Sequence, residues 1–247
     1  MFNCIIIVSI MVLFCCYDIL LSFSRFFVPS RAFEITERFT KRAVKHIFNL
    51  MRTYAHVCLE YQNFSGETLP ERFLLVTNHQ SLMDIPICIE LFPDNRLRFV
   101  AKKELGVGIP FVSLILRSQG HALVKRKGDA AHAMRSILRF SRRCKQEKTC
   151  PVIFPEGTRT RDGEVGAFHS AGIRKILDET PLPLVVAVLD GGWKVAKIKA
   201  VINNLQGARF RVRVLSVTPT LRTKKEVLAA LEKAHDDIVA GLAALRS

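Results

Sequence analysis

Apolar residues along the chain fall into three successive patterns, and each predicts a different structure. Residues 4–21 are almost continuously apolar and close in length to one bilayer crossing, which predicts a membrane-associated helix. Residues 33–54 carry apolar side chains at every third or fourth position, the spacing of an amphipathic helix. After Gly66, short apolar runs alternate with helical spacing, which predicts an α/β domain with a largely parallel mixed sheet flanked by helices.

These patterns divide the chain into a hydrophobic membrane anchor (1–27), a basic amphipathic helix near the membrane (28–62) and an α/β domain (63–247). Functional loops of such a sheet follow the carboxyl ends of its strands, so the residues after each strand are the first candidates for chemistry. The strands are predicted at 72–78, 97–102, 121–125, 151–154, 182–189, 197–203 and 210–217, and the helices at 85–92, 128–146 and 224–245.

The apolar N-terminal run has a signal peptide as its rival interpretation. A signal peptide needs a basic residue ahead of the run and a small-residue cleavage site, but the first basic residue is Arg25. We therefore expect a retained membrane segment, with Asp18 near its end, where the interface can solvate the carboxylate. The basic residues that follow place the body of the protein in the cytoplasm by the positive-inside rule. Whether residues 4–27 cross the bilayer or lie along one leaflet stays open.

The amphipathic helix also has two interpretations. Its basic side suits a membrane interface, and the same pattern suits a helix that packs on the α/β domain with a solvated charged face. The two are compatible along one helix. Its apolar positions are Phe39, Ala43, Ile47, Leu50, Met51 and Tyr54, and its basic positions are Arg38, Lys41, Arg42, Lys45 and Arg52.

Composition narrows the class of protein. The 247 residues carry a formal net charge of +15, which implies an anionic partner such as nucleic acid, anionic lipid, a phosphorylated substrate or an acidic carrier protein. The seven cysteines are odd in number and form no CxxC motif, which argues against a zinc site or a disulfide framework and favours a reducing compartment. We therefore expect no metal.

The stretch TNHQSLMD (77–84) follows the first predicted strand and can be interpreted in two ways. In the first, the stretch starts a helix: residues 81–84 form a capping box, or Asp84 itself is the N-cap with Pro86 in the first turn, and His79 is then a polar loop residue. Alternatively, His79 and Asp84 form an acid–base pair, in which His79 takes a proton from an attacking alcohol and Asp84 orients the imidazole.

A second stretch, VIFPEGTRTR (152–161), leaves another apolar strand. Gly157 allows the backbone to approach a ligand closely, and Arg159 and Arg161 suit contacts with a phosphate. The plainer interpretation is a charged turn in which Glu156 pairs with Arg159.

Taken together, these stretches resemble the glycerolipid acyltransferase family over roughly residues 73–188. NHQSLMD (78–84) is similar to the family's His-four-residues-Asp block and FPEGTRT (154–160) to its phosphate-binding block. The order and spacing fit as well. Further matching stretches are AKKEL (101–105), GHALVKR (120–126) and LPLVVAV (182–188).

The resemblance implies roles for individual residues. His79 would be the general base for the free hydroxyl of a lysophospholipid, foremost lysophosphatidic acid, and Asp84 would orient it. The acyl donor would be a thioester, acyl-CoA or acyl-carrier protein, attacked directly without a cofactor or a covalent enzyme intermediate. Arg159 would bind the substrate phosphate, and Glu156, Gly157 and Thr158 would shape that loop, with Glu156 expected to touch substrate. Weaker phosphate candidates are Arg126, Arg161 and Lys102.

Two positions depart from the family pattern. Val186 stands where the last block usually has a proline, and Phe168-His169 replaces the usual Phe-Lys, which makes His169 a possible extra ligand contact against the plainer expectation of a surface histidine.

Other functions stay open or are excluded. The same chemistry could serve glycerol-3-phosphate, a lyso-ornithine lipid or another lysolipid, and a non-catalytic lipid-binding membrane protein is the rival from another class. The anionic substrate, an anionic membrane surface and an acidic carrier protein account for the charge, so no nucleic acid is expected, and zinc-finger or RNP-like motifs are lacking. The sequence has no GxSxG, P-loop or GxGxxG motif, and Cys88 reads as a buried structural thiol.

Overall fold

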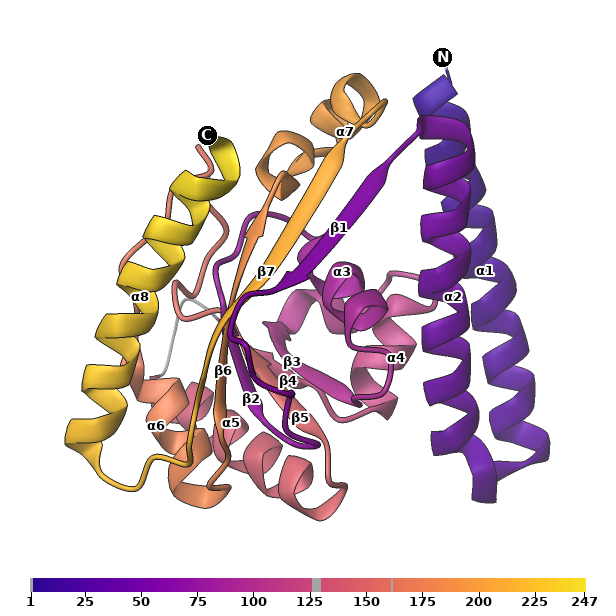
Figure 1. The fold of residues 1–247 in the computed structure, drawn as a ribbon. Helices are drawn as coiled ribbons and strands as arrows, with labels where there is room; N and C mark the ends of the chain where they lie inside the picture. Colours follow the sequence, from indigo (N-terminus) through magenta and orange to yellow (C-terminus); the bar gives the residue numbers. More distant parts are fainter. Residues whose placement is uncertain (1, 126–129, 161) are drawn as a thin grey trace.

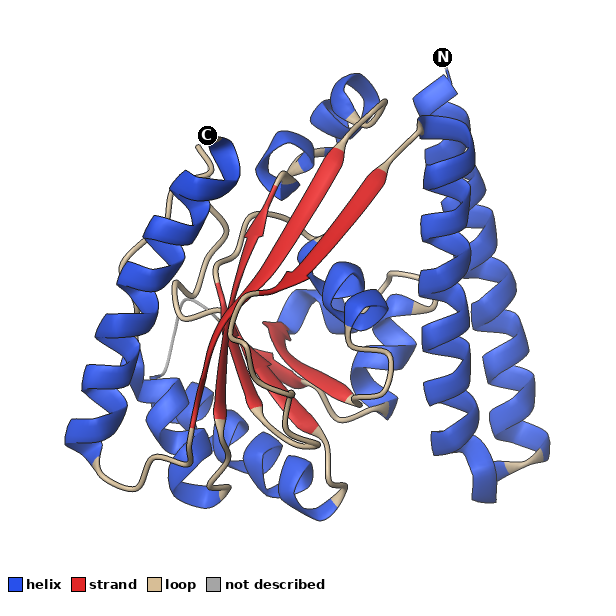
Figure 2. Cartoon of the chain, in the orientation of Figure 1, coloured by secondary structure: helices blue, strands red, loops and turns tan. Residues whose placement is uncertain are grey.

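The computed structural model describes residues 2–125, 130–160 and 162–247, and its centre is a seven-stranded sheet of order β1-β7-β6-β2-β5-β3-β4 (Figure 1). Helices α1, α2, α3 and α4 lie on one side of this sheet, and α5, α6 and α8 on the other (Figure 2). The strands are β1 (Cys58–Asn63), β2 (Leu74–Thr77), β3 (Leu97–Lys102), β4 (Ala122–Val124), β5 (Cys150–Ile153), β6 (Leu184–Asp190) and β7 (Arg209–Thr218). The α-helices are α1 (Phe2–Phe27), α2 (Ala32–Ala55), α3 (Asp84–Leu91), α4 (Val112–Ser118), α5 (Ala130–Gln146), α6 (Ser170–Glu179), α7 (Ile198–Asn204) and α8 (Lys224–Arg246), with short 3-10 turns η1 (Pro29–Arg31), η2 (Lys103–Gly106) and η3 (Gly192–Val195).

The direction of the strands determines where the functional loops lie. Strands β2, β3, β4, β5 and β6 run parallel to one another, whereas β7 pairs antiparallel with β6, and β1 pairs parallel with β7. The carboxyl ends of the five parallel strands therefore meet at one edge of the sheet, where ligands bind in open α/β sheets. The prediction of a largely parallel mixed sheet flanked by helices is confirmed.

Each face of the sheet has its own apolar core. Central strands such as β6 are buried along their whole length, which is why their sequences are continuously apolar rather than alternating. On one face the sheet packs against α2 and α3 through residues such as Phe48 and Phe99, and on the other against α5, α6 and α8 through residues such as Ile173 and Ile238. The two cores fix the strand ends that carry the polar loops.

Helices α1 and α2 form an antiparallel pair on the first face (Figure 1). α1 turns Tyr17 and Leu21 inward, and the backbone N–H of Phe111 donates to Asp18 Oδ1 at 2.7 Å, so Asp18 has a partner inside the protein. Buried Arg98 of β3 forms an ion pair with Glu37, which ties α2 to the sheet. α2 therefore packs on the α/β domain, as one of its two interpretations required.

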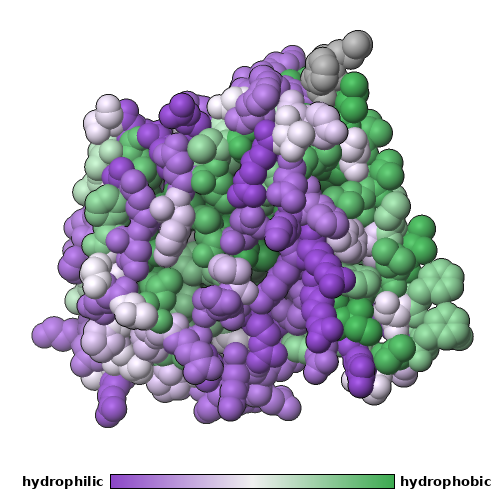
Figure 3. Space-filling model, turned by 45° about the vertical axis from the view of Figure 1, so that its right-hand side comes forward, coloured by the Kyte–Doolittle hydropathy of each residue, from purple (hydrophilic) through white to green (hydrophobic). Residues whose placement is uncertain are grey.

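The outward face of α1 is apolar. Asn3–Phe27 is long and apolar enough to cross a membrane, with a mean hydropathy of 2.7, and only 17% of its most apolar 18-residue stretch is buried. Seen from this side, apolar side chains cover one margin of the molecule over α1, beside a hydrophilic surface (Figure 3). The exposed members include Ile5, Val8, Val12, Ile19, Phe23 and Phe26.

Two sequence predictions need correction. Residues 197–203 are predicted as a strand, but 198–203 lie in helix α7 and Lys197 is its N-cap, because β7 pairs directly with β6 and this segment only connects them. Asn3 Nδ2 donates to the carbonyl of Ile202 at 2.7 Å. Residues 58–62, grouped with the amphipathic helix, belong to edge strand β1, since α2 ends at Ala55. Helices α4 and α6 were not predicted.

Candidate active site

The loops after β2, β5 and β6 meet at the carboxyl edge of the sheet. Asn78, which directly follows β2, donates from Nδ2 to the carbonyl of Leu189 at 2.8 Å and accepts the backbone N–H of Leu189 at 2.8 Å. These two hydrogen bonds hold the start of the loop 78–83, which we call the His79 loop, at the end of β6. The backbone N–H of Thr160 donates to the carbonyl of His79 at 2.9 Å, which joins the loop after β5 to the same place.

His79 and Asp84 form a close, buried pair. His79 Nδ1 lies 2.8 Å from Asp84 Oδ2, and their side chains are 8% and 1% exposed. Asp84 Oδ2 also accepts the backbone N–H groups of Gln80 at 2.7 Å and Ser81 at 2.9 Å. Because Asp84 Oδ2 already accepts two backbone N–H groups, it acts as an acceptor toward the ring too, which assigns the proton of this pair to Nδ1 of His79.

A helix does start within the same stretch, but the expectation that Asp84 caps it is wrong, because Met83 occupies the cap position and forms no side-chain cap hydrogen bond. α3 begins at Asp84, and Ser81 Oγ accepts the backbone N–H of Met83 at 3.0 Å. Asp84 is thus the first residue of a helix and the partner of His79 at once. Its backbone contacts fix the carboxylate so that it can orient the imidazole.

The other ring nitrogen of His79 is open. Phe154 stacks on the imidazole at 4.1 Å between ring centroids and an interplanar angle of 16°, which fixes the plane of the ring. Across residues 2–125, 130–160 and 162–247 no hydrogen bond to His79 Nε2 occurs. A histidine with Nδ1–H bonded to a carboxylate and a free Nε2 is arranged to accept a proton from a ligand.

Glu156 is buried and contacts the backbone of the His79 loop. Its Oε1 accepts the backbone N–H of His79 at 2.8 Å, and its Oε2 accepts the backbone N–H of Gly166 at 3.0 Å. Burial raises the pKa of Glu156, and the two backbone N–H groups oppose that shift. In the part of the chain that the structure describes, Glu156 forms no ion pair with Arg159, whose Nη1 donates to the carbonyl of Ala196 at 3.4 Å.

The remaining candidates lie around the same edge. Gly157 is exposed and has φ of 66°, a conformation that side chains rarely adopt, and Thr158 beside it is exposed as well. Arg159 is half-buried, and Lys102 is exposed at the end of β3, the neighbour of β5. His169 is exposed, and a Cβ on Gly157 would lie 3.8 Å from its Cδ2. Two predicted phosphate contacts, Arg126 and Arg161, lie outside the described residues.

The block 120–126 contains a second histidine with a different environment. His121 Nδ1 accepts the backbone N–H of Phe99 at 3.0 Å, and Nε2 lies 3.2 Å from Gln119 Oε1. Burial and the positive charges of Arg98 and Arg143 lower the pKa of His121 to about 3, so this ring is neutral. Burial raises the pKa of the Cys88 thiol, which agrees with its interpretation as a structural cysteine.

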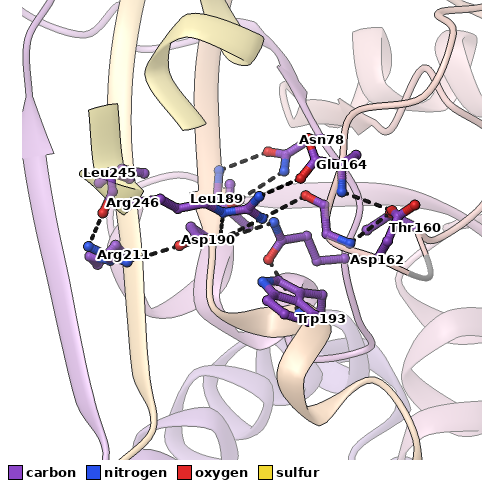
Figure 4. Close-up of polar contacts among 12 residues, drawn as sticks. Asn78, Thr160, Asp162, Glu164, Leu189, Asp190, Trp193, Arg211, Leu245 and Arg246 are labelled. Atoms are coloured by element: carbon purple, nitrogen blue, oxygen red, sulfur yellow. Dashed lines mark hydrogen bonds and ion pairs between the residues drawn. The ribbon is translucent and has the colours of Figure 1, made fainter. Parts of the chain in front are cut away.

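Sequence reasoning missed a polar cluster next to the His79 loop. Asp190, at the end of β6, is buried and forms ion pairs with Arg211 at 3.0 Å and Arg246 at 3.2 Å (Figure 4). Gln80 Nε2 lies 3.4 Å from Asp190 Oδ1, and Gln80 Oε1 accepts the backbone N–H of Trp193 at 3.3 Å. These residues are far apart in sequence, and no motif connects them.

Among the described residues, no three or more His, Cys, Asp or Glu side chains are grouped so that they could hold a metal ion.

Comparisons with known proteins agree with this geometry. A model of the Acyltransferase family matches residues 62–189, just over half of the chain. The 1-acyl-sn-glycerol-3-phosphate acyltransferase of Helicobacter pylori is 35% identical over 59% of this chain and 60% of the relative. The Saccharomyces cerevisiae protein of the same name is 27% identical over 83% of this chain and 66% of the relative. The matches thus span about two thirds or less of these relatives' lengths.

A solved structure supports the fold. The 1-acyl-sn-glycerophosphate acyltransferase PlsC from Thermotoga maritima has a TM-score of 0.74 over 100% of this chain and 95% of that chain, at 19% identity. The likeness extends beyond residues 62–189 to the N-terminal helices and the C-terminal part of the chain.

Proposed function

The chain belongs to the acyltransferase family, and from this premise we propose that it moves a fatty acyl group from a thioester to the sn-2 hydroxyl of lysophosphatidic acid, giving phosphatidic acid. The donor is acyl-CoA or acyl-carrier protein, and phospholipid biosynthesis is the setting. The observation that carries the proposal is the buried His79–Asp84 pair with its open Nε2, held against the loop that contains Arg159. Relatives named for this reaction support the choice of acceptor.

The chemistry follows from the two ring nitrogens of His79. Nε2 takes the proton of the acceptor hydroxyl as its oxygen attacks the thioester carbonyl carbon. Asp84 accepts Nδ1–H and stabilises the imidazolium that forms. When the tetrahedral intermediate collapses, the C–S bond breaks and the sulfur leaves with the proton from Nε2. The acyl group passes directly to the acceptor, so the proposal requires no nucleophilic serine or cysteine.

Phosphate recognition is assigned to the loop after β5. Arg159 has five N–H donors on a planar guanidinium, which suits bidentate contact with a phosphate. Lys102 at the neighbouring strand end, with Arg126 and Arg161, adds positive charge in this proposal. Gly157 and Thr158 shape the turn that leads to Arg159.

For Glu156 the geometry favours a different role from contact with substrate. Its two carboxylate oxygens accept the N–H groups of His79 and Gly166, which lie 77 and 10 residues away in sequence. We assign Glu156 the task of holding the His79 loop against the loop after β5. A carboxylate engaged in this way positions the base without touching the reacting atoms.

The membrane is the proposed source of the acceptor. The exposed apolar side of α1 suits the hydrocarbon region, and the basic positions of α2 suit anionic headgroups. The basic residues that follow α1 support placement of the α/β domain on the cytoplasmic side.

The test is acyl transfer by the full chain in detergent or vesicles, with oleoyl-CoA and oleoyl-carrier protein as donors. The acceptors are lysophosphatidic acid, glycerol-3-phosphate, a lyso-ornithine lipid and lysophosphatidylcholine, and His79→Ala is the control. Phosphatidic acid formed by wild type and lost in His79→Ala supports the proposal. Transfer to a different acceptor corrects the substrate, and lipid binding without transfer from either donor leaves a binding protein instead.

A further inference from the structure

The last turn of α8 carries an arginine that reaches across the edge of the sheet (Figure 4). Arg246 Nη2 donates to the carbonyl of Gly163 at 2.7 Å, and Nη1 donates to Glu164 Oε1 at 2.8 Å. Its Nε and Nη2 both lie 3.2 Å from Asp190 Oδ1. One guanidinium therefore bridges α8, the end of β6 and residues 162–166, which follow the proposed phosphate-binding residues in the loop after β5.

The bridged stretch is ordered by its own hydrogen bonds as well. Thr160 Oγ1 donates to Asp162 Oδ1 at 2.7 Å and accepts the backbone N–H of Gly163 at 3.1 Å. The same Thr160 donates its backbone N–H to the carbonyl of His79. Thr160 is thus tied to the His79 loop, and Gly163 and Glu164 are tied to Arg246.

Packing around Gly163 leaves little room for the loop to move. Gly163 has φ of 93°, and a Cβ there would lie 2.6 Å from Arg246 Nη2 and 2.9 Å from Trp193 Cδ1. The Arg246 guanidinium also lies over the Trp193 ring, 5.7 Å from its centroid. The loop fits against Arg246 and Trp193 only because residue 163 has no side chain.

Asp190 links this contact to the proposed base. It is 4% exposed, and its Oδ1 faces both Arg246 and the amide of fully buried Gln80, the residue after His79. Arg211 Nη2 donates to Asp190 Oδ2 at 3.0 Å, so Asp190 keeps one cation if Arg246 is replaced. The His79 loop therefore has a second support, whereas the contact of α8 with residues 163 and 164 depends on Arg246.

We propose that Arg246 is a positioning residue that sets the acceptor affinity of the site, by holding the loop after β5 in place for phosphate binding. This proposal rests on the proposed function. Asp190, Trp193, Arg211 and Arg246 lie outside residues 62–189, the span of the family match. A loose loop would weaken acceptor binding while leaving His79 and Asp84 in place.

The experiment measures initial rates with separately varied acceptor and donor, on the full chain in detergent. The variants are Arg246→Met, Arg246→Lys and the matched control Arg209→Met, an arginine that is 74% exposed and pairs only distantly with Glu60. We expect Arg246→Met to raise KM for lysophosphatidic acid about tenfold, because small displacements of positioning groups have large effects. KM for the donor and all constants of Arg209→Met should stay near wild type. Arg246→Lys should fall between, since lysine keeps the charge and lacks the guanidinium fork.

A purely structural role would lower the amount of active protein, and with it the apparent kcat, but would not change the acceptor KM of the molecules that remain folded. An unchanged acceptor KM in folded Arg246→Met therefore overturns the proposal. If that variant does not fold, Arg246→Lys is held to the same criterion.

Amide hydrogen exchange separates this proposal from the proposed function. In Arg246→Met, the peptide covering 154–166 should exchange at least about tenfold faster, while the first turns of α8 stay at wild-type rates. If wild type fails to acylate lysophosphatidic acid, this readout still tests the contact. Unchanged exchange at 154–166 overturns the positioning role whatever the substrate proves to be.

Discussion

Two histidines, His79 and His121, lie in blocks that resemble the same family, and their surroundings differ in the feature that matters for catalysis. Both are buried, and both stack on a phenylalanine, Phe154 for His79 and Phe99 for His121. His79 gives Nδ1–H to a carboxylate and leaves Nε2 open. His121 uses Nδ1 to accept a backbone N–H, and its other nitrogen lies against Gln119.

The two rings are therefore expected in opposite neutral tautomers. Asp84 requires the proton on Nδ1 of His79, and the N–H of Phe99 requires it on Nε2 of His121. Burial and aromatic packing are common to both histidines, so these two features do not identify the general base. A carboxylate on one nitrogen and an open second nitrogen distinguish the candidate base from the structural histidine.

Asp84→Asn removes the carboxylate that distinguishes His79 from His121. Compared with the Arg159 and His121 variants below, we expect it to have the largest effect on activity. The amide cannot accept Nδ1–H and two backbone N–H groups as a carboxylate does, so the ring loses its tautomer and orientation. We expect kcat to fall roughly 10⁴-fold, by analogy with the aspartate of a catalytic triad. Exposed Asp94→Asn is the matched control, and a variant at Asp84 that retains wild-type kcat would remove Asp84 from the mechanism.

Arg159→Met leaves both histidines unchanged. It tests whether the loop after β5 binds the acceptor phosphate independently of the proton transfer by His79. A charge-assisted hydrogen bond contributes about 1.5–3 kcal/mol, so we expect the acceptor KM to rise about tenfold or more. The kcat at saturating acceptor should change far less. Arg209→Met again serves as control, and a fall in kcat with an unchanged KM would place Arg159 in the chemical step instead.

We expect the smallest effect on activity from substitution of His121. This histidine should instead affect the pH dependence of the free energy of unfolding. The folded pKa of about 3 lies below the ordinary value of 6.5, so the neutral ring contributes stability that is complete above pH 6.5 and is lost as the pH falls toward 3. Through this residue alone, the free energy of unfolding should decrease by about 2 kcal/mol from pH 7 to pH 5.

Urea unfolding of wild type and His121→Asn at both pH values measures this difference. The variant should be less stable at pH 7 and should lose less stability on acidification. Equal losses in the two proteins would show that His121 is not held neutral by its surroundings.

Much of the fold can be predicted from apolar patterning, because buried central strands and amphipathic helices have strong signals. The predicted strands 97–102 and 210–217 correspond to β3 and β7 within a residue at each end. Edge strand β1 has mostly exposed, polar residues and gives no such signal. The apolar pattern of residues 197–203 is compatible with a strand or a helix. Because β6 pairs directly with β7, no strand lies between them, and the segment forms a helix.

The site is predictable only where it is local in sequence. His79 and Asp84 lie five residues apart in one loop, so the sequence can suggest their pairing. Glu156 reaches His79 across 77 residues, and Arg246 reaches Asp190 across 56. Those contacts depend on the order β6-β2-β5, which brings the three loops together and which local patterns do not encode.

The contrast between the two histidines is tested most directly by assaying His79→Asn and His121→Asn side by side for acyl transfer to lysophosphatidic acid, at equal concentrations of folded protein. If His79 is the base, its variant should lose roughly 10³-fold or more in kcat, while the His121 variant stays within about threefold of wild type. Undiminished transfer by His79→Asn, or equal losses in the two variants, would contradict the assignment of His79 as the base.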